Sequence, residues 1–283
     1  ATGGSLVHCC GLLTERLDDL VPAEGDLTAA TVRLSDPTPL ERPLRWEVDG
    51  TDADGSGLAV HLLDGETLLG TARRTTAPEL TVPAPVGLEG ARAAAAGFDP
   101  SGHPYPGCYV CGPEAEGGLR VFVGPVAGRD DVLASPVTLT EEGLPPVLAA
   151  LDCPGAFTVG FGEEALLLGT LTSTVHAEAP RGRELVVIAW AIGREGRKRH
   201  SGTALLDGER VLATAAATWI APAPTQETPR PAPSPSSPAP APASAPPPRG
   251  CSTPVAGASA CWTSTTGRWR HWRRSWAGRG TPS

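Results

Sequence analysis

Hydrophobic residues recur every three or four positions in two stretches of the chain, and this spacing predicts two amphipathic helices. The first stretch, Gly3–Val21, places leucines and a cysteine on one face and stops before Pro22. The second stretch, Gly143–Gly155, repeats leucine and valine at the same spacing. Pro145 and Pro146 suit a first helical turn, whereas the pair Pro154-Gly155 predicts that the second helix breaks or kinks there.

Asp152 lies at the edge of the apolar stripe of the second predicted helix, close to its expected end. Two interpretations fit this position. Asp152 is either a solvated residue in the last helical turn or a functional acid held on an otherwise apolar helix. The pattern alone leaves both open.

Elsewhere the chain is dominated by short apolar runs between Gly, Pro and Asp residues, which is typical of strands. The predicted strands are Thr28–Leu34, Pro43–Val48, Leu58–Leu63, Thr67–Arg73, Leu119–Val123, Val132–Leu139, Leu166–His176, Glu184–Ile192, Ser201–Leu206 and Arg210–Trp219. Asp64-Gly65 and Asp207-Gly208 predict tight two-residue hairpins.

The two halves of this pattern repeat each other. Thr31-Val32 matches Thr174-Val175, and Leu62–Glu66 matches Leu205–Glu209 at the same offset along the chain. Self-similarity of this length predicts a duplicated subdomain. We therefore expect a first unit over 1–80, a linker over 81–117, a second unit over 118–222 and a tail over 223–283. The first unit lacks the strands that precede the second helix, so we expect it to be truncated at its N-terminus.

Composition narrows the function classes. The formal net charge is −8, although the segment from Ala223 onward contributes seven Arg and only one Glu, so the preceding residues are strongly acidic. An acidic body does not favour nucleic-acid binding, and no apolar run is long enough to span a membrane. The seven cysteines are irregularly spaced, which favours a reduced, cytoplasmic protein. The Pro/Ala-rich and Arg/Trp-rich tail is expected to be disordered.

A helix followed by a strand meander, present twice in one chain, resembles the hotdog fold. Ala149–Cys153, Gly193–Lys198, Pro104–Pro113 and the two Leu-Leu-Asp-Gly hairpins resemble segments of acyl-CoA thioesterases of the phenylacetyl-CoA type and related actinobacterial thioesterase-like proteins. The resemblance implies an α+β double hotdog, in which a curved antiparallel sheet wraps each helix. It also implies hydrolysis of acyl-CoA thioesters. A catalytically inactive hotdog protein that binds acyl or CoA ligands is the alternative, and a hydratase is disfavoured because no Asp/His dyad is visible.

The same resemblance implies roles for individual residues. Asp152 would be the base or nucleophile, and Thr170 a hydroxyl that supports it. Gly4, at the start of the first helix, would supply a backbone N–H for the oxyanion, because Pro145 occupies the corresponding position in the second helix and has no N–H. The cations implied to bind the phosphates of coenzyme A are Arg194, Arg197 and Lys198.

One group of residues has metal-ligand chemistry. His103, Cys108 and Cys111 lie close together in the sequence, and a closed zinc site would need a fourth ligand, for which Cys153 is the candidate. We expect a loop with two free thiols instead, with no metal and no cofactor apart from coenzyme A as part of the substrate. The expected partner is an acyl-CoA, without nucleic acid or membrane, and a homo-oligomer is left open.

Overall fold

The computed structural model describes residues 6–21, 28–39, 43–50, 57–101, 103–163 and 166–222. The chain divides into two units, Ala1–Ala223 and Pro224–Ser283, and the second lies wholly outside the described residues, as does the predicted disorder of the tail. Within the described residues, no helix is long and apolar enough to cross a membrane.

The unit Ala1–Ala223 consists of one antiparallel sheet and three described helices. The helices are α1 (Leu6–Leu20), α2 (Leu88–Ala96) and α3 (Leu144–Thr158). The strands are β1 (Ala29–Leu34), β2 (Arg45–Asp49), β3 (Ala59–Asp64), β4 (Thr67–Thr75), β5 (Gly124–Pro125), β6 (Leu133–Thr138), β7 (Leu167–Val175), β8 (Glu184–Glu195), β9 (Lys198–Asp207) and β10 (Arg210–Ile220). Their order across the sheet is β2-β3-β4-β1-β7-β10-β9-β8-β6-β5.

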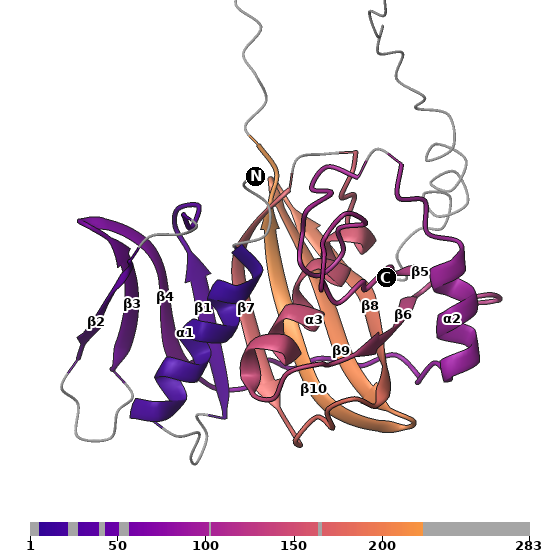
Figure 1. The fold of residues 1–283 in the computed structure, drawn as a ribbon, viewed down its shortest axis with the longest axis horizontal. Helices are drawn as coiled ribbons and strands as arrows, with labels where there is room; N and C mark the ends of the chain where they lie inside the picture. The colour runs from indigo at the N-terminus through magenta and orange to yellow at the C-terminus, as the bar shows by residue number, and fades with distance from the viewer. Residues whose placement is uncertain are drawn as a thin grey trace, which may run out of the picture. The chain divides into compact units, whose positions relative to one another are not determined.

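The order of elements after α1 recurs after α3. From the middle of the sheet outward, the strands run β1-β4-β3-β2 on one side and β7-β10-β9-β8 on the other (Figure 1). The two series meet where β1 pairs antiparallel with β7, from Ala30 opposite Ser173 to Arg33 opposite Thr170. The strands β5 and β6, which precede α3, have no counterpart before α1 among the described residues.

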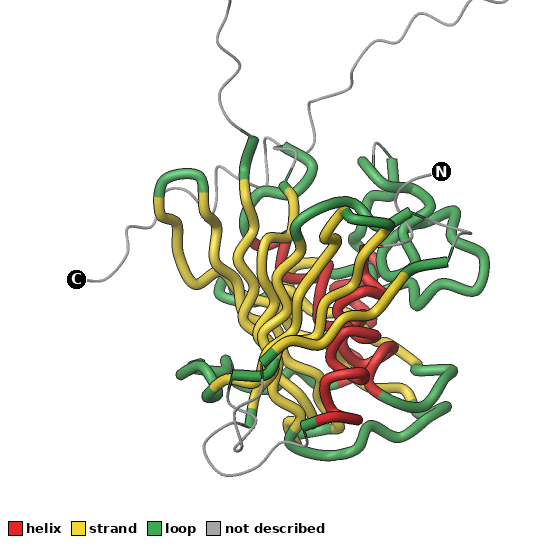
Figure 2. Tube along the Cα trace, turned by 90° about the vertical axis from the view of Figure 1, so that its left-hand side faces the viewer, coloured by secondary structure: helices red, strands yellow, loops and turns green. Residues whose placement is uncertain are grey.

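The two long helices, α1 and α3, cover one face of this sheet (Figures 1 and 2). Arg74 of β4 donates hydrogen bonds to Asp18 and to the Val21 carbonyl, which ties the end of α1 to the sheet. The hydroxyl group of Thr203 on β9 donates a hydrogen bond of 2.7 Å to the Leu151 carbonyl of α3. Side chains that point toward these helices therefore form the main core of the unit.

The opposite face of β8 and β9 is also covered. Ala91 and Ala94 of α2 belong to one cluster of buried side chains with Ile188 and Ala204, which alternate with the α3-facing residues of their strands. Because both faces are buried, these strands read in the sequence as continuous apolar runs rather than as alternating ones.

The helices α1 and α3 approach each other very closely at Gly11. A Cβ atom built on Gly11 would lie 2.3 Å from the Cα atom of Pro145, so only glycine fits at this contact. Cys10, the preceding residue, is fully buried. The contact joins the two halves of the described unit through their helices as well as through the β1–β7 pairing.

We expect Gly11→Ala to destabilise the protein by about 1–3 kcal/mol, because a new methyl group would force these two helices apart. Gly87→Ala is a matched control, since a Cβ there would have no atom within 4 Å and the backbone is extended. Urea unfolding at neutral pH measures both variants. Equal stability of the two variants would contradict the close helix contact.

The predicted hairpins are confirmed, with glycine at the first position of each turn. Gly65 between β3 and β4 has φ +58°, and Gly208 between β9 and β10 has φ +63°. Gly196 repeats this geometry between β8 and β9 with φ +54°. Glycine adopts this left-handed conformation at no steric cost, and the resulting turn matches the twist of the paired strands.

Of the two alternatives predicted at Pro154-Gly155, a break or a kink, the break is wrong, because α3 continues through Pro154 to Thr158. Pro154 and Gly155 are both buried and serve packing rather than termination. A Cβ on Gly155 would lie 2.4 Å from the Ser201 hydroxyl, so glycine lets the helix lie directly on β9. The helix ends one turn later, where Gly160 takes a φ of +106°.

Two predictions between the repeats also need correction. The predicted linker contains α2, because its alanine-rich run has high helix propensity and packs against β6. The segment Leu119–Val123 is not a strand, although Leu119, Val121 and Val123 are buried. Leu119 and Val121 donate backbone hydrogen bonds to the loop residues Tyr109 and Val110 instead of joining the sheet.

Candidate functional site

Asp152 lies in the middle of α3 and is only 2% exposed. The interpretation as a solvated or terminal helix residue is therefore wrong, and the reason is that the helix continues past Pro154 and carries Asp152 into the core. Burial, with a smaller contribution from the nearby Cys108, raises the pKa of Asp152 from 3.8 to about 8. A carboxyl group in this position is a protonated acid at neutral pH and a potential base once it loses its proton.

The helix α1 contributes to the surroundings of Asp152. The pKa of the Cys10 thiol is raised, first by burial and then by the charge of Asp152, so Cys10 lies close to the carboxyl group. Gly11 follows and contacts Pro145 at the start of α3. The N-terminal half of α1 thus faces the part of α3 that carries the acid.

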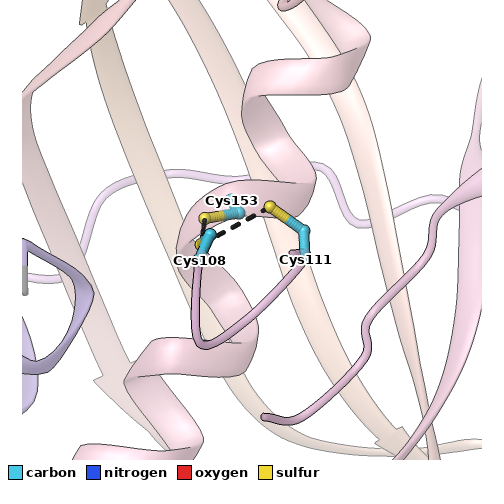
Figure 3. Close-up of side chains that lie close together, drawn as sticks. All are labelled: Cys108, Cys111 and Cys153. Atoms are coloured by element: carbon cyan, nitrogen blue, oxygen red, sulfur yellow. Dashed lines mark hydrogen bonds between the residues drawn. The ribbon is translucent and has the colours of Figure 1, made fainter. Parts of the chain in front are cut away.

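Three cysteine thiols converge on one another (Figure 3). Cys108 is close enough to Asp152 to contribute to the raised pKa of that carboxyl group. Cys108 and Cys111 come from the loop that precedes Gly112, and Cys153 comes from α3. The Sγ atom of Cys108 lies 3.6 Å from that of Cys153 and 3.6 Å from that of Cys111. The loop is held by two backbone hydrogen bonds, from Gly112 to the Cys108 carbonyl and from Cys108 to the Tyr105 carbonyl.

The pKa values of the three thiols are shifted in different directions. The other two thiols hydrogen-bond to Cys108 and lower its pKa, so its thiolate is the favoured one. The same hydrogen bonds to Cys108 raise the pKa values of Cys111 and Cys153. The group therefore titrates as a coupled set rather than as three independent thiols.

His103 lies next to this group in an aromatic setting. Its ring packs against Phe98, Phe157 and Phe161, with centroid distances of 6.2, 6.0 and 5.8 Å. Burial lowers the pKa of His103. The Tyr105 backbone N–H donates to Nδ1 at 3.1 Å, so the neutral ring carries its proton on Nε2, which is buried without a hydrogen-bond partner.

The other residues that the sequence singled out lie apart from Asp152 or outside the described residues. Gly4 lies outside the described residues. Thr170 of β7 is paired with Arg33 of β1. The next residue, Leu171, is buried and points to the opposite face of the sheet from Thr170. Leu171 pairs with Val32, and Val32 in turn pairs with Ala72 of β4, so these three residues share one face. Ala72 shares a face with Arg74, which contacts α1, so Thr170 lies on the face away from the helices. The structure does not bring Thr170 to Asp152.

Arg194, Arg197 and Lys198 lie together at the exposed end of the β8–β9 hairpin. The Arg197 Nε donates a hydrogen bond of 2.8 Å to the Ala221 carbonyl, which fixes the base of its guanidinium group. Along β9, Lys198 precedes Thr203, which contacts α3. Five residues of strand separate them by about 17 Å, so the cations lie some distance from the acid.

Two cavities lined by described residues lie elsewhere. One of about 510 Å³ is bounded by the edge strand β2 and its neighbours β3 and β4 and includes His61. Another of about 270 Å³ lies beside β7 and β10 and includes His176 and Thr214, whose side chains hydrogen-bond at 3.0 Å. Asp152 lines neither cavity, in keeping with its burial.

No protein-family model matches the sequence, and a search of curated proteins finds no match. Several solved structures share the fold. A protein of unknown function with a hot dog fold from Alicyclobacillus acidocaldarius has a TM-score of 0.53 and 15% identity, over 79% of this chain and 89% of that chain. The tesB protein of Mycobacterium avium subs paratuberculosis has a TM-score of 0.50 and 12% identity, over 78% and 87%.

A third structure, the dehydratase domain of a mycocerosic acid synthase-like polyketide synthase, has a TM-score of 0.51 and 13% identity, over 76% of this chain and 81% of that chain. Together these similarities show that the chain has a hotdog fold, as the resemblance of its sequence implied. One of these proteins has no known function and another is a dehydratase domain, so the shared fold does not define an activity, which has to be argued from the site.

The sequence could not reveal the convergence of the three cysteines. Cys153 stands next to Asp152 in the sequence but far from Cys108 and Cys111. The only signal was the choice of Cys153 as a fourth ligand, and that choice depended on a fold that brings the loop onto α3.

Proposed function

We propose that this protein hydrolyses acyl-CoA thioesters in a fused double hotdog, with Asp152 as base or nucleophile. The observation that carries the proposal is a single acid buried on the central helix α3 of a hotdog sheet. A carboxylate in this position can activate water or attack the thioester carbon. The recurring order of strands after α1 and α3 supports two fused units. The fold itself is shared with the tesB protein.

The proposed oxyanion donor comes from the first of the two predicted repeats, residues 1–80. Pro145 and Pro146 occupy the first turn of α3 and have no N–H to donate, so the start of this helix is a poor oxyanion site. The N-terminal half of α1 approaches Asp152, as the coupling with Cys10 indicates. Gly4, just before the described part of α1, remains the proposed donor. Thr170 is left out of the proposed site because it lies on the other face of the sheet.

The test is hydrolysis of a panel of acyl-CoAs of different chain length by the full chain, with release of free thiol as the readout. Hydrolysis of at least one acyl-CoA well above the uncatalysed rate supports the proposal. A protein that binds acyl-CoA in calorimetry and hydrolyses none is the inactive binding protein instead. Hydration of crotonyl-CoA without hydrolysis would assign the site to a different reaction.

The exposed cations of the β8–β9 hairpin are proposed to bind the phosphates of coenzyme A. Replacing Arg194, Arg197 and Lys198 together by Ala should raise KM for acyl-CoA tenfold or more, because charge-assisted hydrogen bonds to phosphate are lost. The same variant should hydrolyse acyl-N-acetylcysteamine, which lacks the nucleotide, with unchanged KM. Arg210→Ala, an exposed Arg at the other hairpin, is the matched control. Equal effects on both substrates would contradict the assignment.

The proposed hydrolysis of acyl-CoA thioesters also implies what the protein binds. The substrate is a soluble acyl-CoA, coenzyme A enters only as part of it, and no nucleic acid or membrane takes part. We also propose a cytoplasmic location and a homo-oligomer.

A further inference from the structure

We propose that Cys108, Cys111 and Cys153 bind one Zn²⁺ ion through their three thiolates. The three Sγ atoms lie within 4.8 Å of one another, two from a short loop and one from the helix that carries Asp152 (Figure 3). This site is separate from thioester hydrolysis, and the proposal does not depend on that function.

The spacing of the sulfur atoms favours a metal ion over a disulfide. Zinc holds thiolates at about 2.3 Å in a tetrahedron, whose edges are then about 3.8 Å long. The Sγ atom of Cys108 lies 3.6 Å from each of the other two Sγ atoms. A disulfide would bring one pair to about 2.05 Å and leave the third thiol without a role. The observed arrangement is symmetric about Cys108 and matches two edges of a coordination tetrahedron.

The electrostatic setting also favours a cation. The ionisable groups that interact with the three thiols include the other thiols and Asp152, which are acidic, and His103, whose pKa is lowered by burial. Cys108 and Cys111 are 3% and 1% exposed. A second or third thiolate in this buried group would be strongly unfavourable by itself, and a divalent ion would compensate it. Soft thiolate ligands select zinc over the hard cations magnesium and calcium.

The local backbone is preorganised for such an ion. The spacing Cys-x2-Cys recurs in structural zinc sites, and here the loop is closed by the hydrogen bond of 2.8 Å from Gly112 to the Cys108 carbonyl. A Cβ on Gly112 would lie 2.4 Å from two backbone atoms of this loop, so the turn requires glycine. The third ligand, Cys153, is fixed by α3, which is held on the sheet by Thr203.

Three thiolates leave one position of the tetrahedron, and we assign it to solvent. His103 is not placed as a ligand, because its Nδ1 accepts the Tyr105 N–H and its Nε2 therefore carries a proton. The buried and unpartnered Nε2–H instead makes His103 a hydrogen-bond donor beside the thiolates. Zinc binding would release the thiol protons of the group to solvent and form three Zn–S bonds without any change of oxidation state.

The experiment measures the metal content of the full chain after growth with added zinc and dialysis into metal-free buffer. We expect about one zinc per chain in the unaltered protein. The double variant Cys108→Ser/Cys153→Ser should hold less than a tenth of that. Three controls should keep about one zinc: Cys9→Ser on α1, the tail variant Cys251→Ser/Cys261→Ser, and His103→Ala. Loss of zinc in His103→Ala would make His103 a ligand and overturn the three-thiolate assignment.

A second measurement needs no variant at the site. Zinc added at about a hundredfold excess over its dissociation constant should raise the melting temperature of the chelator-treated full chain by roughly 5–10 °C. Cobalt should replace zinc and give the thiolate-to-metal charge-transfer absorption of a tetrahedral site. The proposal is overturned if the reduced protein shows no such shift and no such absorption. It is also overturned if the native protein holds copper instead, or contains a disulfide between Cys108 and either partner.

Discussion

Asp152→Asn is expected to lower kcat for acyl-CoA hydrolysis by about a hundredfold or more, with little change in KM. The substitution keeps the shape and nearly the volume of a side chain that is only 2% exposed, so the packing of α3 should survive. It removes the carboxylate that we propose takes a proton from water or attacks the thioester carbon. A group that acts mainly in the transition state affects kcat rather than substrate binding.

Steady-state kinetics on the best acyl-CoA of the panel measures this effect. Asp19→Asn is the matched control, because Asp19 lies on α1 with an exposed side chain that forms a 3.7 Å ion pair with Arg16. It should retain the activity of the unaltered protein. Full activity of Asp152→Asn on every hydrolysed substrate would exclude Asp152 as base or nucleophile. The metal content of Asp152→Asn should be compared as well, since Cys153 is its neighbour.

The repeated parts of the fold were predictable from the sequence, because they rest on local signals. The spacing of Leu13 and Leu17 indicated α1, and the glycines at 65 and 208 indicated hairpins that only a left-handed residue closes tightly. The one offset shared by both halves indicated the repeated order of strands. These signals can be recognised without knowing which helices and strands pack against each other.

The errors came from residues whose role is set by packing partners far along the chain. Pro154-Gly155 has the form of a helix break, yet the close approach of Gly155 to Ser201 makes it a site of helix–sheet contact. That contact lengthens α3 and carries Asp152 inside. The alanine run of α2 has high helix propensity, but the Gly and Pro residues around it led to the prediction of a linker. The alternation that places Thr170 on the far face becomes visible only once β7 is paired with β1.

In the metal-free protein, Asp152→Asn is expected to gain stability over the unaltered chain as the pH rises. Burial holds the pKa of Asp152 at about 8 in the folded state, against 3.8 ordinarily. Below pH 4 both states keep the proton, and the carboxyl contributes no pH dependence. Between pH 4 and pH 8 only the folded state keeps it, so the stability of the unaltered protein falls by about 1.4 kcal/mol per pH unit. Above pH 8 both states are ionised and the loss levels off.

Asn cannot titrate, so the difference in unfolding free energy between Asp152→Asn and the unaltered protein should widen by on the order of 5 kcal/mol from pH 4 to pH 8. Urea unfolding of both proteins, with chelator present and at constant ionic strength, measures this difference. Asp19→Asn, which removes an exposed carboxyl of α1, is the control variant measured over the same range. A constant difference for Asp152→Asn would mean that the folded protein accommodates the ionised carboxyl, which would place Asp152 in contact with solvent or a cation rather than in an apolar core.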